Sequence, residues 1–205
     1  MRRAVTDDRQ DTQVSGSARA RLLDAALAML CERGYRGATS REIARLAQVN
    51  EVTLFRLFST RDDLLAAALV RRAEMDRDRV PAPSGNLEAD LVALTEATME
   101  YLRAGGYLLI GVLPEVGRMP EKQQALVHEA FAEVQRAHAN LFGYYQDTGE
   151  LTKEMGDTLW LAFMGPLLTA ALRAEVRREP LQVDPHTHVR LFLHGCGGAK
   201  TRQKR

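Results

Sequence analysis

Side chains that can recognise the edges of nucleic-acid bases follow one another in a short stretch of the N-terminal third of the chain. The amide of Asn50 can pair with adenine, and the carboxylate of Glu51 can accept from the N4 amino group of cytosine. Val52 and the methyl group of Thr53 can contact a thymine methyl, whereas Arg56 can bind guanine or a phosphate. Such chemistry requires a rigid element that turns these side chains outward together.

The spacing of the apolar residues predicts that element to be a helix from Glu51 to Ser59, with Asn50 as its N-cap. At about 100° per residue, one side of this helix is apolar and forms an anchoring face. The residues on that side are Leu54, Leu57 and Phe58. The opposite side carries Val52, Thr53, Phe55 and Arg56. The inner face is therefore expected to anchor the helix, and the outer face to read a ligand surface.

A second short helix is predicted just before the first, from Thr39 to about Ala47. The Thr39 hydroxyl can cap it, and Glu42 three residues later completes a capping box. Two short helices joined by a tight turn form a helix-turn-helix unit, whose second helix fits the major groove of DNA. Ser40 and Arg41 lie at the N-terminus of the first helix, where free N–H groups favour phosphate, and Arg41 can also reach a guanine edge.

A longer pattern surrounds these two helices, and the segment from Ala18 to Arg72 resembles the DNA-binding domain of the TetR (tetracycline repressor-like) family of bacterial transcriptional regulators. The matching residues are Ala25, Ala26, Gly34, Tyr35, Ala38, Thr39, Ser40, Ile43, Ala44, Ala47, Val49, Thr53, Leu54, Phe55, Phe58, Arg61, Leu64 and Leu65. Three positions depart from the family pattern. Gln48 replaces a glycine of the turn, Leu57 replaces a phosphate-contacting histidine or tyrosine, and Phe55 replaces a tyrosine.

The resemblance implies an all-α protein with an N-terminal three-helix DNA-binding domain and a C-terminal helical domain for ligand binding and dimerisation. The residues expected to contact DNA are Thr39, Ser40, Arg41, Asn50, Glu51, Val52, Thr53, Phe55, Arg56 and Arg61. Arg61 occupies the place of a basic phosphate clamp in the family. The expected partners are a double-stranded operator, a small-molecule effector and a second copy of the chain, which in the family pairs through the last two helices.

Composition agrees with this interpretation. The 205 residues are 45% hydrophobic and carry a net charge of only +1, but residues 15–61 hold eight arginines and four acidic residues, a local charge of +4. Two cysteines, Cys31 and Cys196, cannot form a disulfide framework, which suits a reducing cytosol. No apolar run reaches the length of a membrane span, and no apolar segment follows the opening residues, so a cytoplasmic location is expected.

The chain is expected to divide into a disordered arm at residues 1–17, a DNA-binding domain at 18–80, a helical effector-binding and dimerisation domain at 86–195, and a basic tail at 196–205. The boundary is the Pro- and Gly-containing segment at residues 80–86. Helices are predicted at residues 18–33, 61–79, 87–104, 107–113, 121–147, 152–178 and 184–194, with a kink at Gly165 and Pro166.

The interior of the second domain is where relatives bind a small effector. Its expected lining is apolar and aromatic with few polar groups, which suits a hydrophobic or aromatic ligand. The candidates are Met99, Tyr107, Ile110, Phe131, Gln135, His138, Phe142, Trp160 and Met164. For His138, a place in the core or on the surface is the alternative to a ligand contact.

Other classes of function have weaker support. His186, His188, His194 and Cys196 lie close in sequence, but on a helix the first two point about 200° apart, so no metal site and no cofactor are expected. The motifs of hydrolases, metalloproteases and phosphate-binding loops are missing from the sequence, so it does not read as an enzyme. The main rival is a helical small-molecule-binding or scaffold protein that has lost specific DNA binding, an alternative motivated by Gln48, Glu51 and Leu57. The predicted function is a ligand-responsive repressor that binds a palindromic operator as a homodimer.

Overall fold

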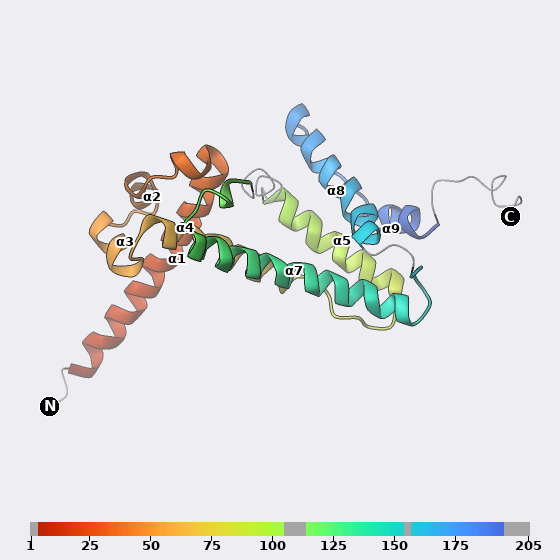
Figure 1. Ribbon diagram of the computed structural model, residues 1–205, viewed down its shortest axis with the longest axis horizontal. Coiled ribbons are helices and arrows are strands. Elements are labelled where there is room, and N and C mark those ends of the chain that lie inside the picture. The colour runs from red at the N-terminus through yellow and green to blue at the C-terminus, as the bar shows by residue number, and fades with distance from the viewer. Residues whose placement is uncertain (1–3, 105–113, 154–156, 195–205) are drawn as a thin grey trace, which may run out of the picture. The chain divides into compact units, whose positions relative to one another are not determined.

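The computed structural model describes the backbone of residues 4–104, 114–153 and 157–194 (Figure 1). Within these ranges the regular structure is helical and contains no strand, so the predicted all-α class is confirmed. The chain forms two compact units. Unit 1 consists of Met1–Glu74 and Leu108–Ala132, and unit 2 consists of Met75–Tyr107 and Glu133–Arg205.

Unit 1 begins with a long helix, α1 (Ala4–Gly37), whose backbone leaves helical geometry at Gly34. There φ is 66°, a conformation that glycine adopts without strain, and this break is where the sequence predicts the first helix to end. Residues 4–17, where the sequence predicts a disordered arm, lie within the bounds of α1.

Three shorter helices complete the N-terminal segment of unit 1: α2 (Ser40–Leu46), α3 (Glu51–Leu57) and α4 (Arg61–Arg77). Their bounds agree with the predicted helices to within two residues. Helix α1 packs against both α2 and α3. The side chains with the smallest exposed fraction form the core of this segment: Leu22, Ala26, Leu30, Ala38, Ile43, Leu54, Leu64, Leu65, Leu69 and Ala73.

The helices of unit 2 are α5 (Leu87–Arg103), the later part of α7 (Glu121–Asp147), α8 (Asp157–Arg177) and α9 (Pro185–His194). Helix α7 has the predicted bounds, and α5 and α9 differ from them by one residue. Helix α8 begins later than the predicted Thr152, and the short helix predicted at residues 107–113 lies outside the described residues. Helix α5 packs against both α8 and α9.

Aromatic rings fill the centre of unit 2. The rings of Phe142, Phe163 and Phe192 meet edge to face, with centroids 5.1–6.4 Å apart. The imidazole of His188 lies 4.8 Å from the Phe163 ring, and burial lowers its pKa. His188 therefore belongs to the core as a neutral side chain, whereas His186 is exposed.

The segment at residues 80–86 is fastened to unit 2 by a buried carboxylate. Asp90 in the first turn of α5 accepts hydrogen bonds from the backbone N–H and the hydroxyl of Ser84, both at 2.7 Å, and from the hydroxyl of Tyr145. Asp90 is 5% exposed and Tyr145 is fully buried. Burial together with the hydrogen bond to Asp90 raises the pKa of Tyr145 to about 12. The network therefore joins α5, α7 and the preceding loop within one unit.

The units do not divide where the sequence suggests. Helix α4 runs without a break to Arg77, and residues 80–86 lie in unit 2 rather than between the units. Residues 108–132 belong to unit 1, although they follow α5 in the chain. The buried apolar side chains of this segment are Val116, Met119 and Val127. A linear division at residues 80–86 misses this return of the chain because the packing is long-range.

Helix α8 leaves much of its apolar surface uncovered within the chain. Leu161, Leu172 and Val176 are 57%, 51% and 84% exposed. By length and composition alone, the segment Thr158–Arg177 is long and apolar enough to cross a membrane. Less than a quarter of this segment is buried inside the chain. Contiguous exposed apolar surface of this kind marks an interaction site. Pro166, where the sequence predicts a kink, lies inside the helix.

Candidate nucleic-acid interface

The two helices of the predicted helix-turn-helix are both capped by side chains at their N-termini. The Thr39 hydroxyl accepts from the N–H of Glu42 at 3.3 Å, and the Asn50 side chain accepts from the N–H of Val52 at 2.9 Å. Each cap satisfies a backbone donor that has no partner inside its helix. The caps fix where α2 and α3 begin, and only residues 47–50 separate the two helices.

Gln48 lies at the tightest point of that turn. Its φ is 53°, the left-handed conformation in which the glycine of the family pattern is free of strain. The side chain is exposed, so no packing contact offsets this cost.

We expect Gln48→Gly to raise the free energy of unfolding by about 1 kcal/mol, because it removes the strain without removing a buried group. Urea unfolding of both proteins measures this difference, with Gln48→Ala as the control that keeps the strain. A glycine variant no more stable than the alanine variant would refute it.

The inner face of α3 is anchored in the core of unit 1. Leu54 is fully buried and Phe58 is 5% exposed, whereas Leu57 is only half-buried. The guanidinium of Arg19 lies 4.5 Å from the centroid of the Phe58 ring, a distance typical of cation–π contacts. Helix α3 is therefore held by α1 at the end away from its N-cap.

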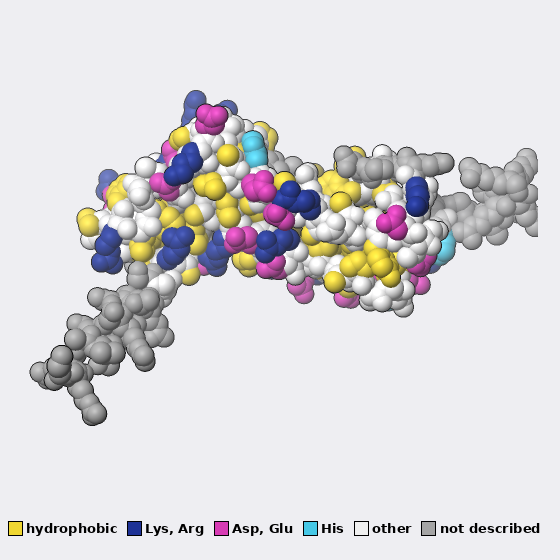
Figure 2. Space-filling model, turned by 60° about the horizontal axis from the view of Figure 1, so that its bottom comes forward, with side chains coloured by type: hydrophobic (Ala, Val, Ile, Leu, Met, Phe, Trp, Pro, Cys, Tyr) yellow, Lys and Arg dark blue, Asp and Glu magenta, His cyan; other side chains and the backbone are white. Residues whose placement is uncertain are grey.

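The outer face of α3 is free. Val52 is 76% exposed and Phe55 is 46% exposed, and Glu51 and Arg56 are exposed beside them, while Thr53 is half-buried. On the face drawn in Figure 2, Lys and Arg side chains are spread among apolar ones over unit 1. An apolar centre with charged neighbours suits contact with thymine methyl groups, flanked by hydrogen bonds to bases or phosphates.

Among the DNA-binding candidates on α2, Arg41 is exposed and Ser40 is half-buried at the first turn. Asn50 and Thr39 already use their side-chain oxygens as caps. A bidentate contact of Asn50 with adenine would therefore have to replace the hydrogen bond to Val52. The structure gives Thr39 and Asn50 the role of fixing the two helices.

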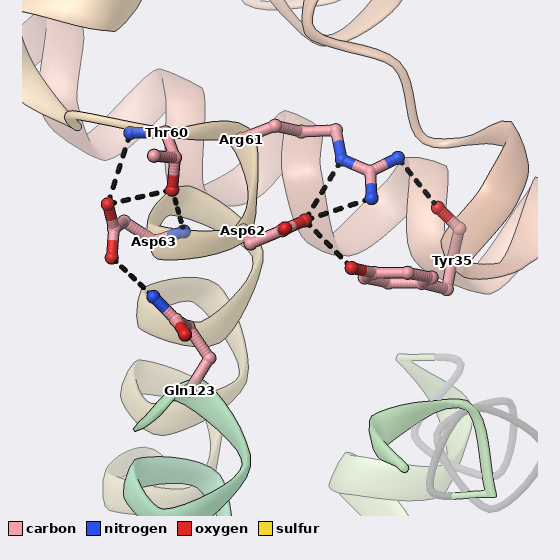
Figure 3. A network of polar contacts seen from close by, with 6 residues as sticks. All are labelled: Tyr35, Thr60, Arg61, Asp62, Asp63 and Gln123. Carbon is pink, nitrogen blue, oxygen red and sulfur yellow. Dashed lines mark hydrogen bonds and ion pairs between the residues drawn. The ribbon is translucent and has the colours of Figure 1, made fainter. Parts of the chain in front are cut away.

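Arg61 is engaged in a network inside unit 1 (Figure 3). Its guanidinium donates to Asp62 at 3.2 and 2.9 Å and to the Tyr35 carbonyl at 3.2 Å, and it lies 4.5 Å from the centroid of the Tyr35 ring. The Tyr35 hydroxyl also donates to Asp62 at 2.9 Å. Burial lowers the pKa of Arg61, but the hydrogen bonds and the charge of Asp62 outweigh it and leave the pKa raised. A phosphate bound by Arg61 would compete with Asp62.

Arg21 is a residue of this region that the sequence reasoning missed. Its Nε donates to the Ala47 carbonyl at 3.0 Å, and its Nη1 donates to the Ser17 hydroxyl at 2.8 Å. Arg21 thereby ties α1 to the end of α2, where carbonyl groups have no partner within the helix. Its only signal in the sequence is an arginine on the polar side of the stripe that contains Leu22 and Ala26.

The candidates for the effector site fall into three groups. Met99, Phe142 and Met164 are in the core of unit 2, with Trp160 packed against it and His138 buried edge-on to Trp160. Burial lowers the pKa of His138, whose Nδ1 lies 2.8 Å from the Val134 carbonyl. Gln135 is exposed and Phe131 belongs to unit 1, while Tyr107 and Ile110 lie outside the described residues.

No group of three or more His, Cys, Asp or Glu side chains is placed to hold a metal ion within residues 4–104, 114–153 and 157–194. Cys196, the last member of the cluster noted in the sequence, lies outside these ranges.

Two capped helices, a tight turn and an outward-facing second helix anchored on a three-helix core define a helix-turn-helix DNA-binding domain. Residues 22–68 match the family model of the bacterial regulatory proteins, tetR family. The match covers the helix-turn-helix segment, which is similar in sequence to the DNA-binding part of this family.

Two relatives of the chain are transcriptional regulators, and a solved structure shares its fold. The uncharacterized HTH-type transcriptional regulator YvkB of Bacillus subtilis is 35% identical over 82 residues, which cover 40% of this chain and 43% of that protein, less than half of its length. The transcriptional regulator AcuR of Cereibacter sphaeroides is 28% identical over 84% of each chain. The structure of the transcriptional regulator FadR from Bacillus subtilis in complex with stearoyl-CoA matches with a TM-score of 0.65 and 16% identity, over 87% of this chain and 99% of that one. This last similarity concerns the fold.

Proposed function

We propose that the protein is a cytoplasmic transcriptional regulator that binds a palindromic operator as a homodimer and releases it when a small hydrophobic or aromatic effector binds. The observation that carries the proposal is the outer face of α3, on which Val52, Phe55 and Arg56 are exposed while Leu54 is fully buried. A helix held in this way can enter the major groove without rearranging its own core.

The exposed apolar surface of α8 supports a dimer. A single recognition helix contacts few base pairs, and a two-fold dimer presents two such helices to half-sites one DNA turn apart. Leu161, Leu172 and Val176 offer an apolar surface for the same surface of a second copy. We propose that α8 and α9 form this interface.

The effector proposal rests on the interior of unit 2. Its core is aromatic, and His138 is a buried polar group among apolar neighbours, a composition typical of ligand sites. The complex of FadR with stearoyl-CoA shows that a protein of this fold can hold a ligand with a long apolar chain. We propose repression as the default mode of action, with effector binding as the signal for release.

The test is selection of genomic DNA fragments by the purified protein, followed by gel-shift titration of the selected fragments. We expect a palindromic site whose affinity falls steeply as the salt concentration rises, because arginines displace counterions from phosphates. The rival, a helical ligand-binding or scaffold protein, predicts no selected fragment even at low salt.

The exposed side chain of Val52 leads to a more specific prediction about the operator. Its side chain is the most exposed apolar group of α3, and a thymine methyl is its natural partner in the major groove. Replacing the contacted thymine by uracil should weaken binding about fourfold, the equivalent of about 0.8 kcal/mol for one buried methyl group. Val52→Ala should abolish this difference between the two DNAs. Equal affinity of the wild type for both DNAs, at every thymine of the site, would exclude the contact.

A further inference from the structure

The start of α4 is fixed by a reciprocal pair of side chains. The Thr60 N–H and hydroxyl donate to Oδ2 of Asp63 at 3.1 and 2.8 Å, and the Asp63 N–H donates to the Thr60 hydroxyl oxygen at 3.0 Å. This is a capping box, with aspartate in the place of the usual glutamate. Helix α3 ends at Leu57, and only residues 58–60 separate it from α4. The direction of the first turn of α4 therefore limits how α3 can be oriented.

The second oxygen of Asp63 is held from a distant part of the chain. Nε2 of Gln123, in the first turn of α7, donates to Oδ1 of Asp63 at 2.8 Å (Figure 3). The two residues are 60 positions apart in sequence, and both lie in unit 1. The hydrogen bonds from Thr60 and Gln123 lower the pKa of Asp63, and the charge of Lys122 acts in the same direction. Asp63 is thus an ionised acceptor, and hydrogen bonds to ionised groups are the stronger ones.

Gln123 is an unusual side chain for a structural role alone. It is 7% exposed, and its Oε1 is buried with no hydrogen-bond partner among the described residues. A buried acceptor without a partner destabilises the folded state. An apolar residue of similar size would avoid this cost, so the amide is best explained by what its Nε2 does to Asp63.

We propose that Gln123 is a positioning residue for DNA binding: through Asp63 and Thr60 it holds the start of α4 and so sets the orientation of α3. This inference rests on the proposed function and deepens it.

The neighbouring network of Tyr35, Arg61 and Asp62 has a different role. It links the end of α1 to the first turn of α4 and includes no residue of α7 (Figure 3). Val127, one turn beyond Gln123, is fully buried. Apolar packing should therefore keep α7 in place when the hydrogen bond of Gln123 is removed, which makes substitution at this position informative.

The test is a cycle of variants with defined hydrogen-bonding patterns. Gln123→Glu sets two carboxylates against each other and breaks the contact. Asp63→Asn preserves it, because the amide of Gln123 can turn over and accept from the Asn side chain. The double variant Asp63→Asn with Gln123→Glu restores a hydrogen bond of reversed polarity, while the Asn oxygen still accepts from Thr60. Ala125→Glu adds the same charge at an exposed position of α7 and is the matched control.

Affinity for a selected operator fragment is measured for each variant. We expect Gln123→Glu to bind about tenfold more weakly than Ala125→Glu, within the usual range of coupling effects. Asp63→Asn and the double variant should remain within about threefold of the wild type. Circular dichroism at the assay temperature shows whether each variant is folded. If Gln123→Glu does not fold, Gln123→Ala replaces it in the comparison, and we expect this variant to bind about threefold to fivefold more weakly than the wild type.

Equal affinities of Gln123→Glu and Ala125→Glu would overturn the inference, as would a double variant that stays as weak as Gln123→Glu. If Gln123→Ala is needed, wild-type affinity for that variant overturns it. A wild-type protein that binds no fragment overturns the proposed function, and the inference falls with it. A wild type that binds its operator while the cycle shows no coupling overturns the inference alone.

Discussion

A protein that carries Leu172→Glu and Val176→Glu is expected to be monomeric and to lose operator binding by a factor of about 100 or more. Both side chains are exposed within a single chain, at 51% and 84%, and lie on the apolar helix α8. In the proposed dimer they are covered by the second copy, so two pairs of like charges would be buried face to face. Without the dimer each half-site is bound separately, and the gain from a second linked contact is lost.

Analytical ultracentrifugation measures the oligomeric state, and gel-shift titration measures operator affinity. The matched control is Leu126→Glu, which adds a charge at an equally exposed leucine on α7, at 52%, within unit 1. The control should remain dimeric and bind DNA. A double variant that still sediments as a dimer would show that this part of α8 is not the interface.

Asp90→Ala should lower the free energy of unfolding of unit 2 by about 3 kcal/mol. The substitution removes an acceptor that serves three donors, two from Ser84 and one from Tyr145. Tyr145 is fully buried, so its hydroxyl would lose the carboxylate to which it donates without gaining water in its place. The single tryptophan, Trp160, packs against the core of unit 2, and its fluorescence reports urea unfolding of this unit.

The control for this substitution is Asp147→Ala, an acidic side chain 85% exposed at the end of α7 that pairs with Lys153. Exposed ion pairs contribute little, and a change below about 0.5 kcal/mol is expected. If Asp90→Ala were no more destabilising than this control, the buried network would not stabilise unit 2.

The same network predicts the pH range over which unit 2 is stable. The hydrogen bonds to Asp90 lower its pKa in spite of its burial, so its contribution is present above the unfolded value of about 3.9 and is lost as the pH falls through the lower folded value. The pKa of Tyr145 is raised to about 12, so its contribution is present below the unfolded value of about 10 and is lost as the pH rises toward 12. Tyr145→Phe should remove the alkaline part of this dependence.

The sequence predicts the DNA-reading helices well because their signals are local. Thr39 and Asn50 cap the helices that begin directly after them, and the placement of Leu54 and Phe58 on one side follows from helical periodicity. The unusual φ of Gln48 is also predictable, because the family pattern has glycine at that point. Each of these features depends on residues within one or two turns.

Features that depend on distant parts of the chain could not be predicted. The hydrogen bond of Gln123 to Asp63 and that of Arg21 to the Ala47 carbonyl join segments 60 and 26 residues apart. The ion pair of Arg61 with Asp62 is local, but it is shaped by Tyr35 from the end of α1. Periodicity shows which face of a helix is buried. It does not show which polar group of a distant segment will be the hydrogen-bond partner of a given side chain.

The effector-binding residues could not be predicted from helical periodicity either. An apolar stripe on α7 or α8 is explained equally well by a core and by a ligand site, and Met99, Phe142 and Met164 do belong to the core of unit 2. A ligand site in this unit would have to open among these side chains, beside the buried His138, whose ring centroid lies 6.2 Å from that of Trp160.

If two copies of α3 enter successive major grooves, the number of chains bound per site can be counted by titrating a selected fragment and following its fluorescence anisotropy. We expect saturation at two chains per palindromic site, or at a multiple of two, with half-sites one DNA turn apart and a loss of affinity when Arg56 is replaced by Ala. Saturation at one chain per site, or unchanged affinity of Arg56→Ala and Val52→Ala for the same fragment, would contradict it.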